Sequence, residues 1–257
     1  MEWYMYLAVI AAGVFAGFIN TVAGSGSLIT LPLLMFLGLP ANIANATNRI
    51  GVFAQSAVSS WSYKRQKMYT ARESLWMAIP AIAGSLLGSM VAIRINERIM
   101  ETLIGGLLIF MFFVILYKPE KWVREHAPAI SKKRKWWVSL VFFFIGIYGG
   151  FIQAGVGFFL LAALVLGAGF GLTKANVLKA IIVATLTLIA LVVFILSGQV
   201  NYLYGIVLAV GQGVGGWLGS RVVVSWGPKV VRIILLVAIM ASALKLTGAL
   251  DYLIGLF

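Results

Sequence analysis

Rare polar and charged side chains lie inside two segments of the chain that are otherwise apolar. Asn45, Asn48 and Arg49 occupy positions i, i+3 and i+4, which places them on one face of a helix. Asn176 and Lys179 repeat the i, i+3 spacing in the second half of the chain. Arg and Lys side chains beside amide donors can hold a negatively charged group. The pattern predicts an anion-binding face, and the alternative is that both cations extend from near a helix end to the membrane surface.

A glycine-containing break precedes each of these two segments. Glycine lets backbones approach closely, and the helix that follows a break presents free N–H groups and the positive end of its dipole. Such a place suits an anion. The predicted binding residues are Asn20, Thr21, Gly24, Ser25, Gly26 and Ser27 in the first break, and Gln153, Gly155 and Gly157 in the second. The alternative is that these glycines only allow close helix packing, the role predicted for Gly13/Gly17, Gly84/Gly88, Gly146/Gly150 and Gly215/Gly219.

The residue types that are missing limit the chemistry. The chain has no Cys, which excludes disulfides, thiolate metal ligands and cysteine nucleophiles. The single His, His126, lies in a charged stretch between apolar segments, so no base is expected within reach of Ser25. We predict no enzyme activity, no metal site and no cofactor. The acidic residues all fall in loops or near segment ends, namely Glu2, Glu73, Glu97, Glu101, Glu120, Glu125 and Asp251. The buried charge is therefore cationic, which fits an anionic substrate.

The composition places most of the chain in lipid. Of 257 residues, 62% are hydrophobic and 11% charged, with a mean hydropathy of +1.03, whereas soluble domains are about 45–50% apolar and about 25% charged. The 20 Lys and Arg residues lie mostly in short stretches between apolar runs. This distribution follows the positive-inside rule and argues against nucleic-acid binding. We expect a multi-pass protein of the cell (inner) membrane whose partners are the bilayer and a small anion, without nucleic acid; no oligomeric state is predicted.

The apolar segments form two series that resemble each other. The first covers residues near 3–21, 25–38, 41–63, 73–94 and 99–117, and the second covers residues near 136–153, 156–170, 173–197, 202–224 and 229–250. Short motifs recur in the same order: GFI begins at Gly17 and at Gly150, and GSLLGS at Gly84 matches GGWLGS at Gly215. Repeated order of this kind indicates an internal repeat.

Equivalent loops of the two series differ in charge. The loop with Lys64, Arg65 and Lys67 corresponds to residues 197–201, which hold no basic residue, and the uncharged turn 38–45 corresponds to a turn with Lys174. Equivalent loops are therefore expected on opposite membrane sides.

The expected fold is an all-α polytopic membrane protein built from two inverted-topology repeats. Each repeat has a broken first segment, giving four helices plus a re-entrant or extra helix per half. Residues 1–117 form the first repeat, 118–135 a cytoplasmic linker and 136–257 the second repeat. Parallel repeats with four crossings each are the alternative.

Two stretches carry a resemblance to a known family. GFINTVAGSGSLITLPLLMFLGLPANIANATN (Gly17 to Asn48) and its echo GGFIQAGVGFFLLAALVLGAGFGLTKANVLKA (Gly149 to Ala180) resemble the TauE/SafE sulfite exporters, also called TSUP permeases. The resemblance implies a membrane permease for sulfur-containing anions such as sulfite, thiosulfate or sulfoacetate. A secondary transporter is the favoured hypothesis; an anion channel and a non-transporting membrane scaffold or sensor are the alternatives.

Overall fold

The computed structural model describes residues 3–68, 71–116 and 135–222, and every regular element in these ranges is a helix. The helices are α1 (Trp3–Ala23), α2 (Ser27–Phe36), α3 (Ala41–Arg65), α4 (Ala71–Ala92), α5 (Glu97–Leu116), α6 (Lys135–Phe151), α7 (Val156–Ala162) with the π-helical turn η3 (Ala163–Gly167), α8 (Leu172–Leu196) and α9 (Tyr202–Val222). They match the predicted segments within these ranges. The predicted segment near 229–250, and the predicted linker except its last residue, lie outside the described residues.

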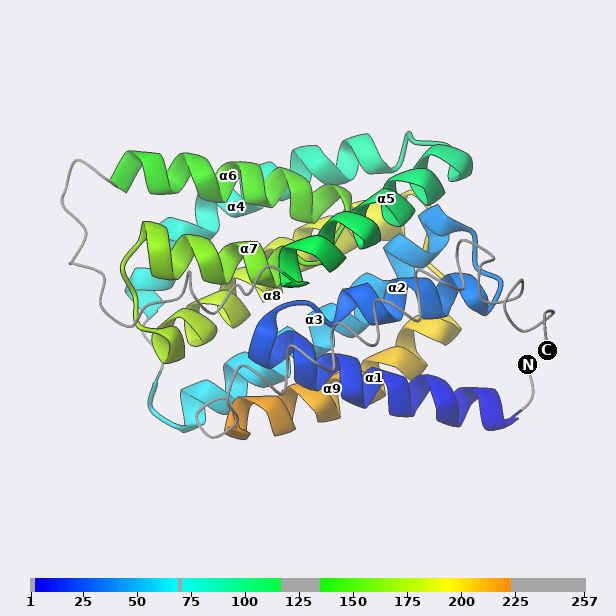
Figure 1. Cartoon of the computed structure of the whole chain (residues 1–257), viewed down its shortest axis with the longest axis horizontal. Coiled ribbons are helices and arrows are strands. Elements are labelled where there is room, and N and C mark those ends of the chain that lie inside the picture. Colours follow the sequence, from blue (N-terminus) through cyan, green and yellow to red (C-terminus); the bar gives the residue numbers. More distant parts are fainter. Residues whose placement is uncertain (1–2, 69–70, 117–134, 223–257) are drawn as a thin grey trace.

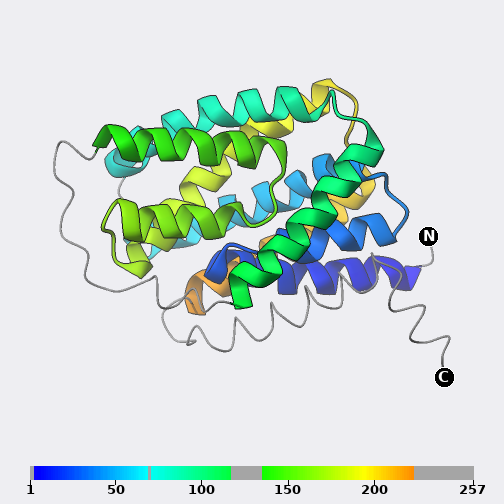
Figure 2. The ribbon, with the colours of Figure 1, turned by 45° about the horizontal axis from the view of Figure 1, so that its top comes forward.

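Two helical hairpins enter the bundle from opposite ends. In Figure 1, α1 and α2 form a hairpin from the right, and α6 and α7 form one from the left; Figure 2 shows the same arrangement after a rotation. Both turns contain a left-handed glycine, Gly24 with φ 77° and Gly155 with φ 74°. These turns lie at the two breaks that the sequence predicts, so both breaks are confirmed.

The tips of the two hairpins touch inside the bundle. The amide of Phe158 donates a hydrogen bond of 3.2 Å to the carbonyl oxygen of Gly24. A Cβ atom on Gly24 would collide with the backbone of Gly157, and a Cβ on Gly157 would collide with the backbone of Gly24. The absence of side chains at both positions is therefore what allows the tips to meet.

The remaining long helices hold the hairpins in place. α3 and α8 run between the hairpins in opposite directions, α4 lies along α6, and α9 lies along α1 (Figure 1). The two outer pairs pack through the predicted small-residue pairs, because a Cβ atom at these positions would press on the backbone or a side chain of the partner helix. The predicted packing glycines are thereby confirmed: Gly13, Gly17, Gly84, Gly88, Gly146, Gly150, Gly215 and Gly219.

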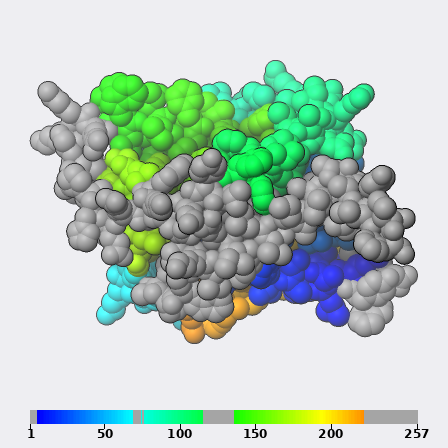
Figure 3. Space-filling view, in the orientation of Figure 1, coloured from blue at the N-terminus to red at the C-terminus, as the bar shows by residue number. Residues whose placement is uncertain are grey.

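The outside of the bundle is apolar. Large hydrophobic side chains are exposed along its outer helices, among them Leu87, Phe110, Phe144, Ile206 and Val210. On the face in Figure 3, residues of α4, α5 and α6 form the upper part of this surface. By length and composition, Met5–Ala23 and Leu172–Leu196 are long and apolar enough to cross a bilayer among the described helices. The bundle thus presents a surface suited to lipid, as an all-helical membrane protein requires.

Basic residues gather at one end of the bundle, which we call the basic end. It carries the end of α3 with exposed Lys64, Arg65 and Lys67, the start of α8 with Lys174 and the end of α9 with Arg221, all at the left in Figure 1. Arg65 and Arg221 stack on Trp61 and Trp217. At the opposite end, the turn between α4 and α5 and the start of α5 hold two basic residues, Arg94 and Arg98, and two acidic residues, Glu97 and Glu101.

Candidate functional site

Polar side chains fill the centre of the bundle, where the hairpin tips meet α3 and α8. The large polar groups buried there are Asn20, Asn45, Asn48, Arg49, Gln55, Gln153, Asn176, Lys179 and Gln212. The sequence predicts all of them except Gln55 and Gln212 as binding residues. In an otherwise apolar bundle, each of these groups needs a partner, because a buried polar atom without one is costly.

Arg49 of α3 binds the carbonyl end of α6. Its guanidinium donates to the backbone oxygens of Gly149 at 2.9 Å and Gly150 at 2.7 Å, and to the side-chain oxygen of Gln153 at 3.1 Å. The last carbonyls of a helix lack intrahelical partners and form the negative end of its dipole, so a cation is favourable there. Asn45, one turn before Arg49, donates to the oxygen of Phe151 at 2.8 Å. Arg49 is fully buried, and its hydrogen bonds hold the end of α6 in place.

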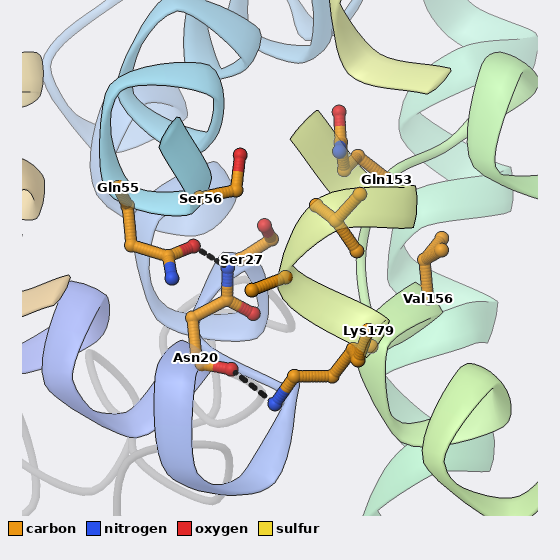
Figure 4. Close-up of a pocket in the computed structure, with 10 residues that line it drawn as sticks. Asn20, Ser27, Gln55, Ser56, Gln153, Val156 and Lys179 are labelled. Atoms are coloured by element: carbon orange, nitrogen blue, oxygen red, sulfur yellow. Dashed lines mark hydrogen bonds between the residues drawn. The ribbon is translucent and has the colours of Figure 1, made fainter. Parts of the chain in front are cut away.

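Lys179 of α8 binds the carbonyl end of α1 in the corresponding way. Its ammonium donates to the backbone oxygens of Asn20 at 3.1 Å and Thr21 at 2.6 Å, and to Oδ1 of Asn176 at 2.8 Å. An ammonium has three donors and no acceptor, so these three oxygens satisfy it. Figure 4 shows the contact between Lys179 and Asn20.

No carboxylate neutralises either cation within the part of the chain that the structure describes. The described acidic residues with placed side chains, Glu97 and Glu101, are exposed at the end opposite the basic end. Arg49 lies 4.6 Å from the ring centroid of Phe194, which adds an attractive contact but no negative charge. Among the described residues, the two buried cations are therefore paired only with neutral dipoles.

An amide network ties the first hairpin to α3. Asn20 donates to Gln55 at 2.7 Å, and Gln55 donates to the hydroxyls of Thr21 at 2.6 Å and Ser59 at 3.2 Å. Oδ1 of Asn20 also accepts from the amide of Gly26 across the turn, at 3.3 Å. Gln55 therefore positions Asn20, and with it the turn that leads into α2.

Two shorter links complete the network. In the second hairpin, Gln153 donates to the hydroxyl of Thr187 in α8 and accepts from Arg49. In α3, Oδ1 of Asn48 accepts from Thr30 of α2 at 2.6 Å and from Gln212 of α9 at 3.5 Å. Asn48 thus joins α2, α3 and α9, while Gln153 joins α6, α3 and α8.

A small cavity lies where the hairpin tips meet α3 and α8 (Figure 4). Its lining residues are Asn20, Ser27, Gln55, Ser56, Gln153, Val156, Gly157, Lys179, Ala180 and Val183. The space open to the centre of a water molecule is about 10 Å³, room for about one water. The cavity is therefore too small for an oxyanion in this structure, and binding one requires its walls to move apart.

The predicted site residues divide into three groups. Asn20, Ser27, Gln153, Gly157 and Lys179 line the cavity. Thr21, Asn45, Asn48, Arg49 and Asn176 lie behind it and hold the hairpin tips or Lys179, while Gly24, Ser25, Gly26 and Gly155 form the turns.

The prediction omits five lining residues: Gln55, Ser56, Val156, Ala180 and Val183. Gln55 and Ser56 follow Asn48 by two turns of the same helix, so the polar helical face that begins at Asn45 already points to them. Val156, Ala180 and Val183 are apolar, so nothing in the sequence distinguishes them, and only the packing of the helices shows that they line the cavity.

The chemistry of the cavity suits binding of an oxyanion. Its lining holds the Lys179 ammonium, the Ser27 hydroxyl and the side-chain amides of Asn20, Gln55 and Gln153. The ammonium and the amides donate to protein oxygens in this structure, and these oxygens are the partners that an anion would replace. Ser27 also begins α2, at the positive end of the dipole of that helix. The lining contains no His, Asp, Glu or Cys.

Comparisons with known proteins give the chain a family. A family model described as sulfite exporter TauE/SafE matches residues 9–246. A probable membrane transporter protein of Sinorhizobium, ORF9, is 28% identical over 96% of this chain and 94% of its own length. The probable membrane transporter protein YfcA of Escherichia coli K12 is 30% identical over 89% of this chain and 85% of its own length. No solved structure shows significant similarity to the chain.

These matches cover nearly the whole chain, including both hairpins, α3 and α8. They agree with the all-helical bundle and its apolar surface. The chain therefore belongs to the sulfite exporter TauE/SafE family and is an integral membrane protein of the transporter class.

Proposed function

We propose that the protein is a secondary transporter for small anions, with sulfur-containing oxyanions or organosulfonates such as sulfite, thiosulfate and sulfoacetate as its substrates. The observation that carries this proposal is Lys179, a buried ammonium that lines the cavity and has only neutral oxygens as partners. The family description supports the sulfur-containing class.

An anion that enters the cavity would supply the negative charge that the present partners of Lys179 lack. Charge-assisted hydrogen bonds are roughly twice as strong as neutral ones, so an oxyanion competes well with the carbonyls of Asn20 and Thr21. Ser27 would donate to another of its oxygens, and the side-chain amides would donate by giving up their present partners. A deprotonated oxyanion can accept all of these hydrogen bonds. A cation in the same place would be repelled by the ammonium of Lys179.

The two hairpins support an alternating-access mechanism. We infer that residues 1–117 and 136–257 are inverted repeats, since the hairpins enter from opposite ends and α3 and α8 run in opposite directions. Broken helices at the interface of inverted repeats are a common substrate site in secondary transporters. In this scheme, displacement of one hairpin opens the cavity to one side, and displacement of the other opens it to the opposite side.

We propose that the protein lies in the inner membrane of the cell and that its basic end faces the cytoplasm. Lys64, Arg65, Lys67, Lys174 and Arg221 all lie at that end. The predicted linker 118–135, which includes Lys132, Lys133, Arg134 and Lys135, then lies on the same side by the positive-inside rule.

Binding and flux by the purified protein test the proposal. A ligand that prefers the folded state raises its melting temperature, so sulfite, thiosulfate or sulfoacetate should stabilise the protein more than chloride does. In proteoliposomes, uptake of the stabilising anion should saturate with its concentration. Linear, non-saturating flux would favour a channel, and binding without flux would favour a sensor. The absence of both with every sulfur anion would contradict the substrate class.

A further inference from the structure

Tyr63 of α3 carries a buried hydroxyl that makes no hydrogen bond with any described residue. Its side chain is 1% exposed. A buried donor without a partner is destabilising, and native proteins keep few of them. Replacing this tyrosine by phenylalanine would remove the unsatisfied group while keeping the ring, so fold stability gives no reason for the hydroxyl.

The position of Tyr63 relates it to the cavity. Ser56 lines the cavity, and Tyr63 follows it by two helical turns on the same face of α3, with half-buried Ser60 between them. Tyr63 forms a buried cluster with Val177 and Ala180 of α8. Ala180 itself lines the cavity. Tyr63 therefore lies directly beyond the cavity, on the side of the basic end.

The neighbouring face of α3 is different. Ser59 donates to the backbone oxygen of Gly216, and the hydroxyls of Ser62 and Ser220 lie 2.7 Å apart. These contacts join α3 to α9 and satisfy the polar groups of that face. On the face that carries Ser56, Ser60 and Tyr63, the two serine hydroxyls donate to backbone oxygens of α3 itself, whereas the hydroxyl of Tyr63 has no partner. This face ends beside exposed Lys64 and Lys67 at the surface.

We propose that Tyr63 is the gate between the cavity and the basic end, and that its hydroxyl donates to the substrate oxyanion as the anion passes between α3 and α8. The proposal rests on the anion-transport function proposed above. In the closed structure the ring seals the passage against Val177 and Ala180. When α3 and α8 separate, the unused hydroxyl of Tyr63 becomes accessible as a donor along the path.

Cysteine labelling tests the gate without any substrate. The natural chain has no Cys, so Ser56→Cys places one thiol in the cavity lining. In membrane vesicles, a membrane-impermeant thiol reagent applied from the basic end should label this thiol several-fold faster when Tyr63→Ala is added. Gln66→Cys, exposed at the end of α3, identifies the vesicles whose basic end is accessible. Tyr204→Ala is the matched control, since Tyr204 lies in α9 and contacts Leu37 at the opposite end. Equal labelling with and without Tyr63→Ala would overturn the gate.

Tyr63→Phe tests the hydroxyl in a variant that keeps the ring. We expect its melting temperature to equal or exceed that of the wild type, because an unsatisfied donor has been removed. Stabilisation by the substrate anion should be unchanged, since Tyr63 does not line the cavity. Uptake of that anion should fall roughly tenfold, the effect of losing one hydrogen bond to a charged group during passage. Uptake equal to that of the wild type would overturn the role of the hydroxyl. A wild type that neither binds nor transports any anion would instead contradict the proposed function, and the labelling result would still decide the gate.

Discussion

Arg49 and Lys179 each bind the carbonyl end of a helix from the other half of the chain. Arg49 of α3 holds the end of α6 through Gly149 and Gly150, and Lys179 of α8 holds the end of α1 through Asn20 and Thr21. The two contacts differ in one respect: Lys179 lines the cavity and Arg49 does not. We infer that Arg49 is a fixed support of the second hairpin, whereas Lys179 can exchange its carbonyl partners for a substrate.

Arg49→Gln should lower the stability of the protein itself. The substitution leaves backbone oxygens of the α6 end without donors, which is expected to cost about 1–3 kcal/mol. The melting temperature of the purified variant without anion should therefore fall below that of the wild type. Arg65→Gln is the control, because Arg65 is exposed and stacks on Trp61 at the basic end. Equal melting temperatures for Arg49→Gln and the wild type would show that the contact does not support the hairpin.

Gly24→Ala should disrupt the meeting of the hairpin tips. The new Cβ would collide with the backbone of Gly157, and φ is 77°. Gly38→Ala provides a matched control, because Gly38 has φ 87° but no atom within 4 Å of the Cβ position. Both variants carry the strain of a left-handed residue, about 1–2 kcal/mol. Only Gly24→Ala adds a collision, so its melting temperature and anion uptake should be clearly lower than those of Gly38→Ala. Similar losses in both variants would mean that close approach is unimportant.

The ends of the bundle should lie on opposite sides of the membrane. Ser197 is exposed in the α8–α9 turn, and Gln66 is exposed at the basic end. In intact cells, a membrane-impermeant maleimide should label Ser197→Cys, and it should label Gln66→Cys only after the membrane is permeabilised. The reverse pattern would contradict the orientation assigned from the basic residues, and labelling of both thiols in intact cells would contradict a spanning bundle.

Local sequence features predicted much of the fold. Apolar runs separated by glycine, proline and charge located the described helices, and the polar breaks at Gly24 and Gly155 located both hairpin turns. These signals act over a few residues, which is why they can be read without a structure. The inverted relation of the halves stays a prediction that the hairpin directions support.

The partners of the buried cations could not be predicted in the same way. Lys179 and Arg49 bind backbone oxygens, and every residue supplies such an oxygen, so no residue type marks the contact. Which cation faces the cavity depends on how α3 and α8 pack against the hairpins. Tyr63 carried no signal in the sequence, because its importance lies in a missing hydrogen bond and in the packing against Ala180.

The central claim is that Lys179 binds the substrate anion, and anion-dependent stabilisation of Lys179→Gln tests it most directly. The melting temperatures of the wild type, Lys179→Gln and Lys174→Gln would be measured with and without millimolar sulfite, thiosulfate or sulfoacetate. Lys174 is the control, because it lies five residues earlier in α8, near the ring of Phe170 and outside the cavity lining. A sulfur anion should raise the melting temperature of the wild type and Lys174→Gln, and it should leave that of folded Lys179→Gln unchanged. A full anion-dependent rise in Lys179→Gln would contradict the account.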